Sequence, residues 1–288
     1  MTGYSSKLKM FYFILLIMII FLASIGISQR FSWNKALAEQ GRWVFNHEFY
    51  LIINTAVGGH WPGYPDETTE FPQEMLVDYI RMYNLEDELI WSDEFEGAEI
   101  NRDFWSFEVG NGHAQGIPGW GNAELQYYTA GENARIKNDK LVIDIKEENR
   151  TDQYGEYNYT STRMVTRNNV HMKYGRIEIK AKLPEGQGIW PAFWMLGTKA
   201  GWPDGGEIDI MELLGHRPSE VHGTVHGPGY SGGHGISNNY ILKEGSFTGQ
   251  FNIFILEWEE DKLRWYINEE KEPFHEVQKT EQGTVIKR

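Results

Sequence analysis

The sequence predicts an all-β domain in which two antiparallel sheets pack against each other. Beyond residue 30, short runs of β-forming residues are separated by Gly, Pro, Asn and Asp, which is the pattern of strands and turns. Within Arg176–Lys182, charged residues alternate with Ile and Ala, which indicates a strand with one solvated face and one core face. No long stretch shows the period of a helix, and one short helix is expected near Trp33–Gln40.

The predicted strands share β-rich composition and flanking turn residues. They are Phe49–Thr55, Leu76–Tyr83, Lys140–Lys146, Gly175–Lys182, Phe251–Trp258 and Leu263–Ile267. The chain of 288 residues is long enough to bury a sizeable core without disulfides, and it contains no Cys.

The charge and the aromatic content restrict the class of partner. A formal net charge of -14 excludes nucleic acid, because phosphate binding needs a surplus of Lys and Arg. A neutral polymer fits this charge better. Aromatic residues make up 14% of the chain, and they can serve the core or stack on the apolar faces of sugar rings.

The N-terminal segment has the features of a targeting sequence. Lys7 and Lys9 precede the apolar run Met10–Leu22, and small residues follow before Arg30. We therefore expect residues 1–30 to be a signal peptide and the protein to be secreted, extracellular or periplasmic. The alternative is an uncleaved membrane anchor, which is the one way in which this chain would associate with a membrane.

The segment Glu207–Glu212, with sequence Glu-Ile-Asp-Ile-Met-Glu, carries the strongest chemical signal. A regular strand would place Glu207 and Asp209 on one face and Glu212 on the apolar face, where a lone carboxylate is costly. A β-bulge at Ile210–Met211 brings Glu212 back beside the other two. The alternative is a solvated acidic strand edge, but the interleaved Ile and Met indicate a half-buried strand.

Three carboxyl groups on one face predict acid–base and nucleophilic chemistry. Glu207 and Glu212 would lie on the order of 6–7 Å apart between Cα atoms, which allows their carboxyl groups the roughly 5–5.5 Å separation of a retaining glycosidase. Like charges this close cannot all be ionised at neutral pH. One carboxyl group must therefore keep a proton and can act as the general acid.

Several motifs resemble glycoside hydrolase family 16, in its laminarinase-like group. They are Trp120–Thr129, Gly188–Leu196, the bulged form of Glu207–Glu212, and Phe49–Asn54 with Gly58 and Gly59. The resemblance implies a concanavalin A-like β-jelly-roll sandwich with a glycan cleft on its concave sheet. It also implies a retaining endo-β-1,3-glucanase in which Glu207 is the nucleophile, Glu212 is the acid/base and Asp209 lies between them and tunes the proton.

The same resemblance implies a polysaccharide-binding set. Its aromatic members line the cleft, its polar members contact the substrate, and its histidine lies near the leaving group; for each aromatic member, core packing is the alternative. The residues are Trp120, Glu124, Arg163, Trp190, Trp194 and His226, and Trp202 is added because it directly precedes the acidic motif.

No cofactor is expected for catalysis, but many relatives bind one structural calcium ion far from the chemistry. The matching positions here are Asp78, Glu96 and Asp139. Calcium prefers oxygen ligands, partly from backbone carbonyls. Asp139 stands where the family usually has glycine, and ordinary surface acids are the alternative interpretation.

The order of segments departs from the family. Residues 31–83 resemble the end of the family domain and residues 84–288 resemble its beginning and catalytic part, with nothing duplicated. A circular permutation explains this order, because domain termini often lie close together. Under this hypothesis residues 31–288 form a single permuted domain. The rival explanation is a misassembled gene.

The sequence leaves the substrate partly open. We expect endohydrolysis of laminarin-like β-1,3-glucan, with mixed-linkage β-1,3-1,4-glucan as a further substrate, by a protein that is monomeric. Hydrolysis of an agar- or carrageenan-type polysaccharide is an alternative. A non-catalytic β-glucan-binding protein is another, although such relatives typically lack one or both glutamates, and both are present here.

Overall fold

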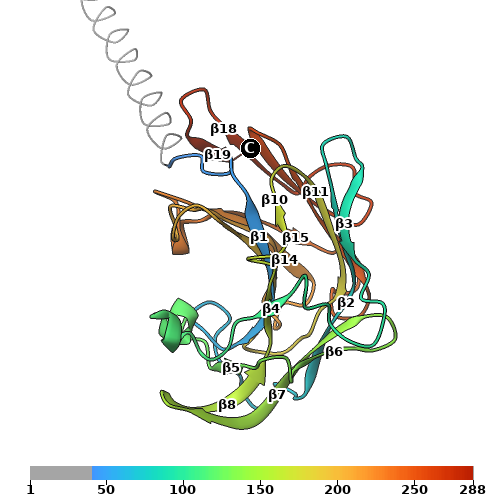
Figure 1. Cartoon of the computed structure of the whole chain (residues 1–288), viewed down its shortest axis with the longest axis vertical. Helices are drawn as coiled ribbons and strands as arrows, with labels where there is room; N and C mark the ends of the chain where they lie inside the picture. The colour runs from blue at the N-terminus through green and yellow to red at the C-terminus, as the bar shows by residue number, and fades with distance from the viewer. Residues whose placement is uncertain (1–40, 288) are drawn as a thin grey trace, which may run out of the picture.

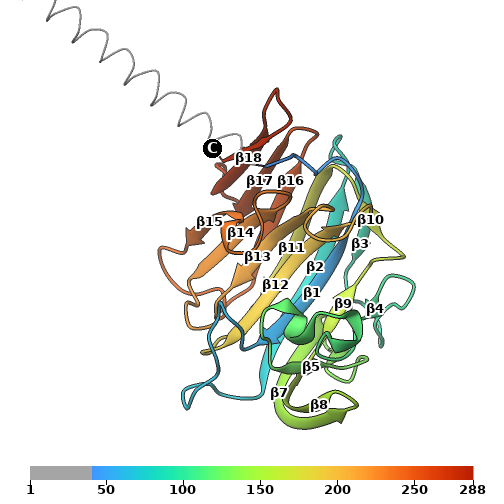
Figure 2. The ribbon, with the colours of Figure 1, turned by 90° about the vertical axis from the view of Figure 1, so that its left-hand side faces the viewer.

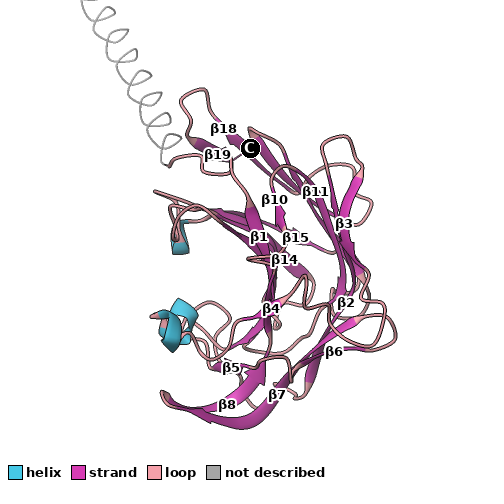
Figure 3. Cartoon of the chain, in the orientation of Figure 1, coloured by secondary structure: helices cyan, strands magenta, loops and turns pink. Residues whose placement is uncertain are grey.

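The chain folds as two β-sheets packed face to face, as predicted (Figures 1 and 3). The computed structural model describes residues 41–287, so the leader at 1–30 and the helix expected at 33–40 lie outside the described residues. Over residues 41–287 there are three short 3-10 helices: η1 (His113–Gln115), η2 (Pro118–Gly121) and η3 (Gly232–His234). No helix in this part of the chain is long and apolar enough to cross a membrane.

The first sheet has eight strands in the order β15-β14-β13-β12-β1-β9-β4, and β10 also pairs with β1. Figure 2 looks onto its outer face, where β15 to β12 lie side by side and η1 and η2 lie in front. Its strands are β1 (Phe49–Val57), β4 (Ser106–Phe107), β9 (Arg163–Val165), β10 (His171–Met172), β12 (Ile189–Gly197), β13 (Glu207–Leu213), β14 (Glu220–His226) and β15 (Ile236–Ile241).

The second sheet has eleven strands in the order β19-β18-β17-β16-β11-β2-β7-β8-β5, with β3 beside β2 and β6 beside β7. The pair β5–β8 is parallel, which departs from the predicted antiparallel arrangement. The strands are β2 (Gln73–Tyr83), β3 (Leu89–Asp93), β5 (Gln126–Tyr128), β6 (Ala134–Ile136), β7 (Leu141–Asp152), β8 (Gly155–Ser161), β11 (Gly175–Lys182), β16 (Asn252–Trp258), β17 (Lys262–Ile267), β18 (His275–Lys279) and β19 (Val285–Lys287).

Alternating burial explains how the sheets pack. In β11, β16 and β17, every second residue is buried, as the alternation within Arg176–Lys182 predicted. The inward side chains of both sheets meet in one large apolar core that contains most of the buried tryptophans. The outward face of β11 carries the charged side chains, so this sheet keeps one face in water.

The segment that precedes residue 84 supplies a central strand to each sheet. In the first sheet, β1 pairs with β12 along its whole length and with β9 and β10 on its other side. In the second sheet, β2 lies between β11 and β7. All nine residues of β1 are buried. The strand predicted at Leu76–Tyr83 is therefore present within β2, and the segment before residue 84 is integral to both sheets.

The two ends of the described chain run side by side. Arg42 forms a bridge with Thr284, the Trp43 amide donates to the Gly283 carbonyl at 2.9 Å, and Val285 donates to the Gly41 carbonyl at 3.2 Å. Figure 1 shows the start of the coloured ribbon beside β19. Residues 41–43 and 283–285 thus form one connected corner of the sandwich.

We predict that Ile53→Ala lowers the free energy of unfolding by about 2–5 kcal/mol, because it opens a cavity in a central strand. Ile53 is fully buried. Ile241→Ala is the control, since Ile241 is 58% exposed, and it should stay within about 0.5 kcal/mol of the wild type. Chemical denaturation followed by circular dichroism measures both. Equal stability of the two variants would contradict the central role of β1.

Candidate active site

The strand β13 contains the predicted bulge. On one side Asp209 pairs with Trp194 and Met211 pairs with Phe193, so the register skips Ile210. On the other side the register shifts between Asp209 and Glu212. The two bulge residues are buried in the core, which is the arrangement that returns Glu212 to the outer face. The bulge at Ile210–Met211 is therefore confirmed.

The outer face of β13 carries the three acids together. Glu207, Asp209 and Glu212 pair on β12 with Leu196, Trp194 and Ala192 respectively. Asp209 is 2% exposed, and the other two acids are half-buried. The solvated acidic edge considered as an alternative is thus excluded, because these groups lie in a largely dehydrated site.

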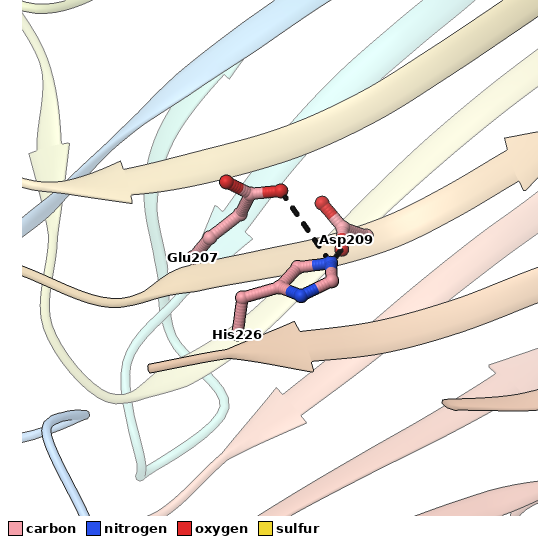
Figure 4. A group of neighbouring side chains, drawn as sticks. All are labelled: Glu207, Asp209 and His226. Atoms are coloured by element: carbon pink, nitrogen blue, oxygen red, sulfur yellow. Dashed lines mark ion pairs between the residues drawn. The ribbon is translucent and has the colours of Figure 1, made fainter. Parts of the chain in front are cut away.

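His226 of β14 completes this acidic group. Its Nε2 lies 3.3 Å from Asp209 Oδ2 and 3.7 Å from Glu207 Oε1. Figure 4 shows both carboxylates turned toward the same ring nitrogen. The ligand atoms of these three residues lie within 4.8 Å of one another, which a metal could also exploit. His226 thus links Glu207 and Asp209 from the neighbouring strand.

Burial raises the pKa of all three carboxyl groups. The pKa of Glu207 rises to about 8, through burial first and the charge of Asp209 second. The pKa of Glu212 rises to about 7 through burial, with Glu207 adding to the rise and His226 opposing it. Burial and the charge of Glu212 raise the pKa of Asp209 well above its usual range. The site therefore retains protons at neutral pH.

Glu212 accepts hydrogen bonds from two outward-facing neighbours. Trp190 of β12 donates its Nε1–H to Glu212 Oε1 at 3.2 Å. Thr224 of β14 donates its hydroxyl to Glu212 Oε2 at 3.5 Å. These donors come from the strands on both sides of β13, so they hold the carboxyl group in a defined orientation.

Exposed tryptophans flank the acids on two sides. Trp202 is 54% exposed, and its ring centroid lies 6.4 Å from that of His226. Trp61 is 42% exposed and packs edge-on against Trp190 at 5.5 Å and His222 at 5.1 Å. An exposed indole beside a polar site is suited to stack on a sugar ring.

Trp61 was not among the predicted site residues. It lies in the Gly- and Pro-rich loop that follows β1, two residues beyond the Gly58-Gly59 pair. That placement was a usable signal, because exposed aromatic residues in loops commonly contact ligands.

Arg163 lies between two of the predicted tryptophans. Its guanidinium carbon is 4.3 Å from the ring centroid of Trp120 and 4.7 Å from that of Trp194. Its Nε donates to Glu108 Oε2 at 2.5 Å, and both side chains are more than nine-tenths buried. Arg167 also contacts Glu108, at 2.7 Å. Glu108 thus anchors the stack, and it too was missed by sequence reasoning.

Glu124 belongs to a buried polar network beside this stack. It accepts hydrogen bonds from Gln126 at 2.7 Å, Asn122 at 3.2 Å and the Tyr128 hydroxyl at 3.3 Å. The Tyr128 oxygen accepts from Asn54, whose own carbonyl oxygen accepts from Trp194. Burial raises the pKa of Glu124, against the opposing charge of Arg163. Glu124 is therefore connected to Trp194 through the side chains of Tyr128 and Asn54.

The three residues suggested for calcium do not form a side-chain cage. Asp78 accepts ion pairs from Lys140 at 3.0 Å and Lys180 at 2.8 Å, so its charge is already balanced. Glu96 and Asp139 are exposed. Among residues 41–287, the metal-compatible group of three is Glu207, Asp209 and His226 instead. The side chains of the expected set therefore do not form a cation cage, and a structural calcium ion stays a prediction.

A two-sheet sandwich whose bulged strand presents clustered acids among tryptophans defines a carbohydrate-active hydrolase of the jelly-roll class. The model of the family "Glycosyl hydrolases family 16" matches residues 121–286, more than half of the chain. This chain belongs to that family.

The chain is similar to several solved β-glucanases. It is 53% identical to the laminarinase catalytic domain from Thermotoga maritima MSB8, with a TM-score of 0.64 over 67% of this chain and 77% of that one. It is 49% identical to an endo-β-1,3-glucanase from Pyrococcus furiosus, with a TM-score of 0.64 over 69% of this chain and 78% of that one. The family expectation from the sequence is thus confirmed.

A β-glucanase of Rhodothermus marinus is 42% identical over 190 residues, which are 63% of this chain. The match spans 63% of the length of that relative, which is less than two thirds.

We predict that the titration of Glu207 and Glu212 lowers the stability of the folded protein as pH rises from about 6.5 to about 8, above the pH range in which the neutral, buried His275 acts in the opposite direction. The folded state holds protons on Glu207 and Glu212 up to their raised pKa values of about 8 and about 7, whereas the unfolded chain loses them near its ordinary value. The unfolded state then binds fewer protons, so the free energy of unfolding decreases with pH.

Glu212→Gln should reduce this decline, because one of the titrating groups is removed. The melting temperature of the variant and of the wild type, measured at pH 6.5 and pH 8, gives the comparison. Glu244→Gln, at an exposed position, serves as the control and should follow the wild type. A decline in Glu212→Gln as steep as in the wild type would contradict the prediction.

Proposed function

We propose that this chain is a retaining endo-hydrolase of laminarin-like β-1,3-glucan that also accepts mixed-linkage β-1,3-1,4-glucan. One observation carries the proposal: the bulged β13 holds Glu207, Asp209 and Glu212 on one outward face, dehydrated and bordered by tryptophans. Two carboxyl groups on one face are the requirement for double displacement.

The two glutamates take different roles in this reaction. In the first step, a Glu207 oxygen bonds to the anomeric carbon as the bond to the glycosidic oxygen breaks, and Glu212 donates its proton to that oxygen. In the second step, Glu212 removes a proton from water, whose oxygen attacks the anomeric carbon and releases Glu207. The configuration at the anomeric carbon is retained because it is inverted twice.

The proposed roles require an ionised Glu207 and a protonated Glu212 before the first step. Taken singly, the two pKa values would keep a proton on Glu207 at a higher pH than on Glu212, which is the reverse of the assignment. The three acids titrate together, however, and Asp209 is the most deeply buried of them. When Asp209 keeps this proton, its O–H can donate a hydrogen bond to Glu207, whose carboxylate stays ionised as a nucleophile must be. Trp190 and Thr224 meanwhile orient Glu212 toward the leaving oxygen.

The substrate class follows from the relatives and from the lining of the site. The two solved proteins described above are a laminarinase and an endo-β-1,3-glucanase, at 53% and 49% identity. The indoles of Trp61 and Trp202 provide apolar surfaces for a neutral sugar chain on two sides of the acids. A β-1,3-glucan is the polymer that satisfies both observations.

We predict that Glu207→Gln and Glu212→Gln each lower kcat by roughly 10³-fold or more, because each removes a separate covalent or proton-transfer role. Reducing-sugar release from laminarin, lichenan, agarose and carrageenan, tested side by side, measures the loss and the substrate class. Proton NMR of the first product formed distinguishes retention from inversion.

Glu212→Ala adds a test of role, because azide can enter the space that it leaves and attack the glycosyl-enzyme. Recovery with azide that forms a β-glycosyl azide in Glu212→Ala, and an α-glycosyl azide in Glu207→Ala, supports the assignment. Substantial activity of both Gln variants on laminarin would refute it. Activity on agarose or carrageenan alone would favour the alternative polysaccharide class, and tight laminarin binding without turnover would favour a binding protein.

We also propose that the segment order is a circular permutation of the family domain. Two facts support it: β1 and β2 occupy central places in the two sheets, and residues 41–43 lie against residues 283–285. The family model covers residues 121–286 and leaves the first part of this chain uncovered. That distribution is expected if relatives carry the equivalent strands at the other end.

We predict that a reordered chain, with residues 31–83 moved behind Arg288, folds and hydrolyses the same substrate at a similar rate. A short linker suffices because the two ends are adjacent. Circular dichroism, the melting temperature and laminarin turnover are compared with those of the original order. As a control, a chain from which residues 31–83 are deleted should not fold, and a folded, active deletion variant would exclude the permutation.

A further inference from the structure

A tryptophan of the second sheet reaches across the core to the catalytic strand. Trp265 of β17 is fully buried, and its Nε1–H donates to the backbone carbonyl of Asp209 at 2.8 Å. Asp209 is the last residue before the register shift of β13. A buried indole N–H needs a hydrogen-bond acceptor. For Trp265 the acceptor is the Asp209 carbonyl, at the beginning of the bulge.

The bulge and this indole share one small residue. On β14, Gly223 lies between Thr224 and His222, the partners of Asp209 and Glu212, so the two bulge residues face this single glycine. A Cβ built at Gly223 would lie 2.6 Å from Trp265 Cδ1 and 2.9 Å from its Nε1. The pyrrole half of the indole therefore occupies the space that any larger residue would need.

The indole is held in place from its own sheet as well. His275 of β18 is the cross-strand partner of Trp265, and the two rings stack with centroids 4.7 Å apart. The His275 Nε2 lies 3.2 Å from the Ile236 carbonyl of β15. Burial lowers the pKa of His275 to about 4, so this ring is neutral at ordinary pH. Trp265 is thus fixed by neighbours from both sheets.

We propose that Trp265 is a positioning residue for catalysis: by holding the Asp209 carbonyl, it fixes the bulge that sets the spacing of Glu207, Asp209 and Glu212. The proposal rests on the proposed glucan hydrolysis. Trp265 contacts no substrate, since it is buried beneath the sheet. Its effect passes through the backbone of β13 to the groups that His226 contacts from the neighbouring strand.

The geometry explains why the bulge needs such a brace. A bulge disrupts the local ladder of hydrogen bonds and leaves a strand freer to change its twist. A rotation of β13 at this point would move Asp209 relative to Glu212, because they lie on opposite sides of the bulge. Misplacement of a catalytic group by about 1 Å can cost about 10²-fold in rate, so a single backbone contact can affect turnover strongly.

The test compares Trp265→Phe with Trp258→Phe. Trp258 is also fully buried, lies on the adjacent β16, and donates its Nε1–H to a backbone carbonyl, that of Phe45, at 3.2 Å. Both variants keep an aromatic ring and lose one indole donor in the same core. For Trp265→Phe we expect kcat on laminarin to fall roughly 10- to 100-fold, with little change in KM and with a displaced limb of the pH–rate profile. Trp258→Phe should keep the pH profile and kcat of the wild type.

Two further measurements make the result decisive. Hydrogen–deuterium exchange of the peptide over residues 207–213 should rise in Trp265→Phe and not in Trp258→Phe, and this readout does not depend on turnover. Should Trp265→Phe fail to fold, Gly223→Ala replaces it, because its methyl group displaces the same indole, and the same kinetic and exchange changes are expected.

Each outcome has a distinct meaning. If both Trp variants lose similar stability while kcat, the pH profile and exchange in β13 stay unchanged, Trp265 is a core residue only and the proposal is overturned. If the wild type hydrolyses no glucan, the proposed function fails. The exchange comparison then still shows whether Trp265 holds the bulge, and unchanged exchange would overturn that as well.

Discussion

The active site depends on one extra residue in β13. Without the bulge at Ile210–Met211, strict alternation would turn the Glu212 carboxyl group into the apolar core, where an unpaired carboxylate is costly. With the bulge, Glu212 joins Glu207 and Asp209 on the outer face, and the buried bulge residues still fill the core. A local irregularity of the strand thus satisfies core packing and chemistry at once, and the neighbouring strands supply what the three acids then need.

Gathering three acids on one dehydrated face has a consequence for the rest of the sandwich. The site raises the pKa of each acid and favours retention of protons, so it opposes folding at higher pH. The surrounding structure must offset this. It does so with His226 from β14, with Trp190 from β12, and with a core that packs both sheets together. Carboxyl groups whose pKa values are raised at a cost in stability are typical of functional sites.

Strands and the bulge could be predicted from the sequence, because they follow from local periodicity. Contacts between residues far apart in the chain could not be predicted. Alternation located the strands and the bulge, because a carboxylate on the apolar face was the one violation in an otherwise regular segment. Trp61 escaped notice because its partners, Trp190 and His222, are more than a hundred residues away in the chain. Similarly, Asp78 was an attractive calcium ligand until the fold placed Lys140 and Lys180 beside it. The contacts of Trp61 and of Asp78 produce no periodic pattern in the sequence.

The catalytic strand β13 pairs with strands that are close to it in sequence, whereas β1 and β2 pair with strands that are far from them in sequence. The strands β12 to β15 form a meander in which each pairs with the next, so β13 is bordered by neighbours that are close in sequence. By contrast, β1 must find β12 across more than a hundred residues, and β2 must find β11 across about as many. Such closures cost chain entropy and are slow. We therefore infer that the meander alone can order the outer acids only loosely. The bulge becomes fixed when the second sheet packs beneath it and the Trp265 indole reaches the Asp209 carbonyl.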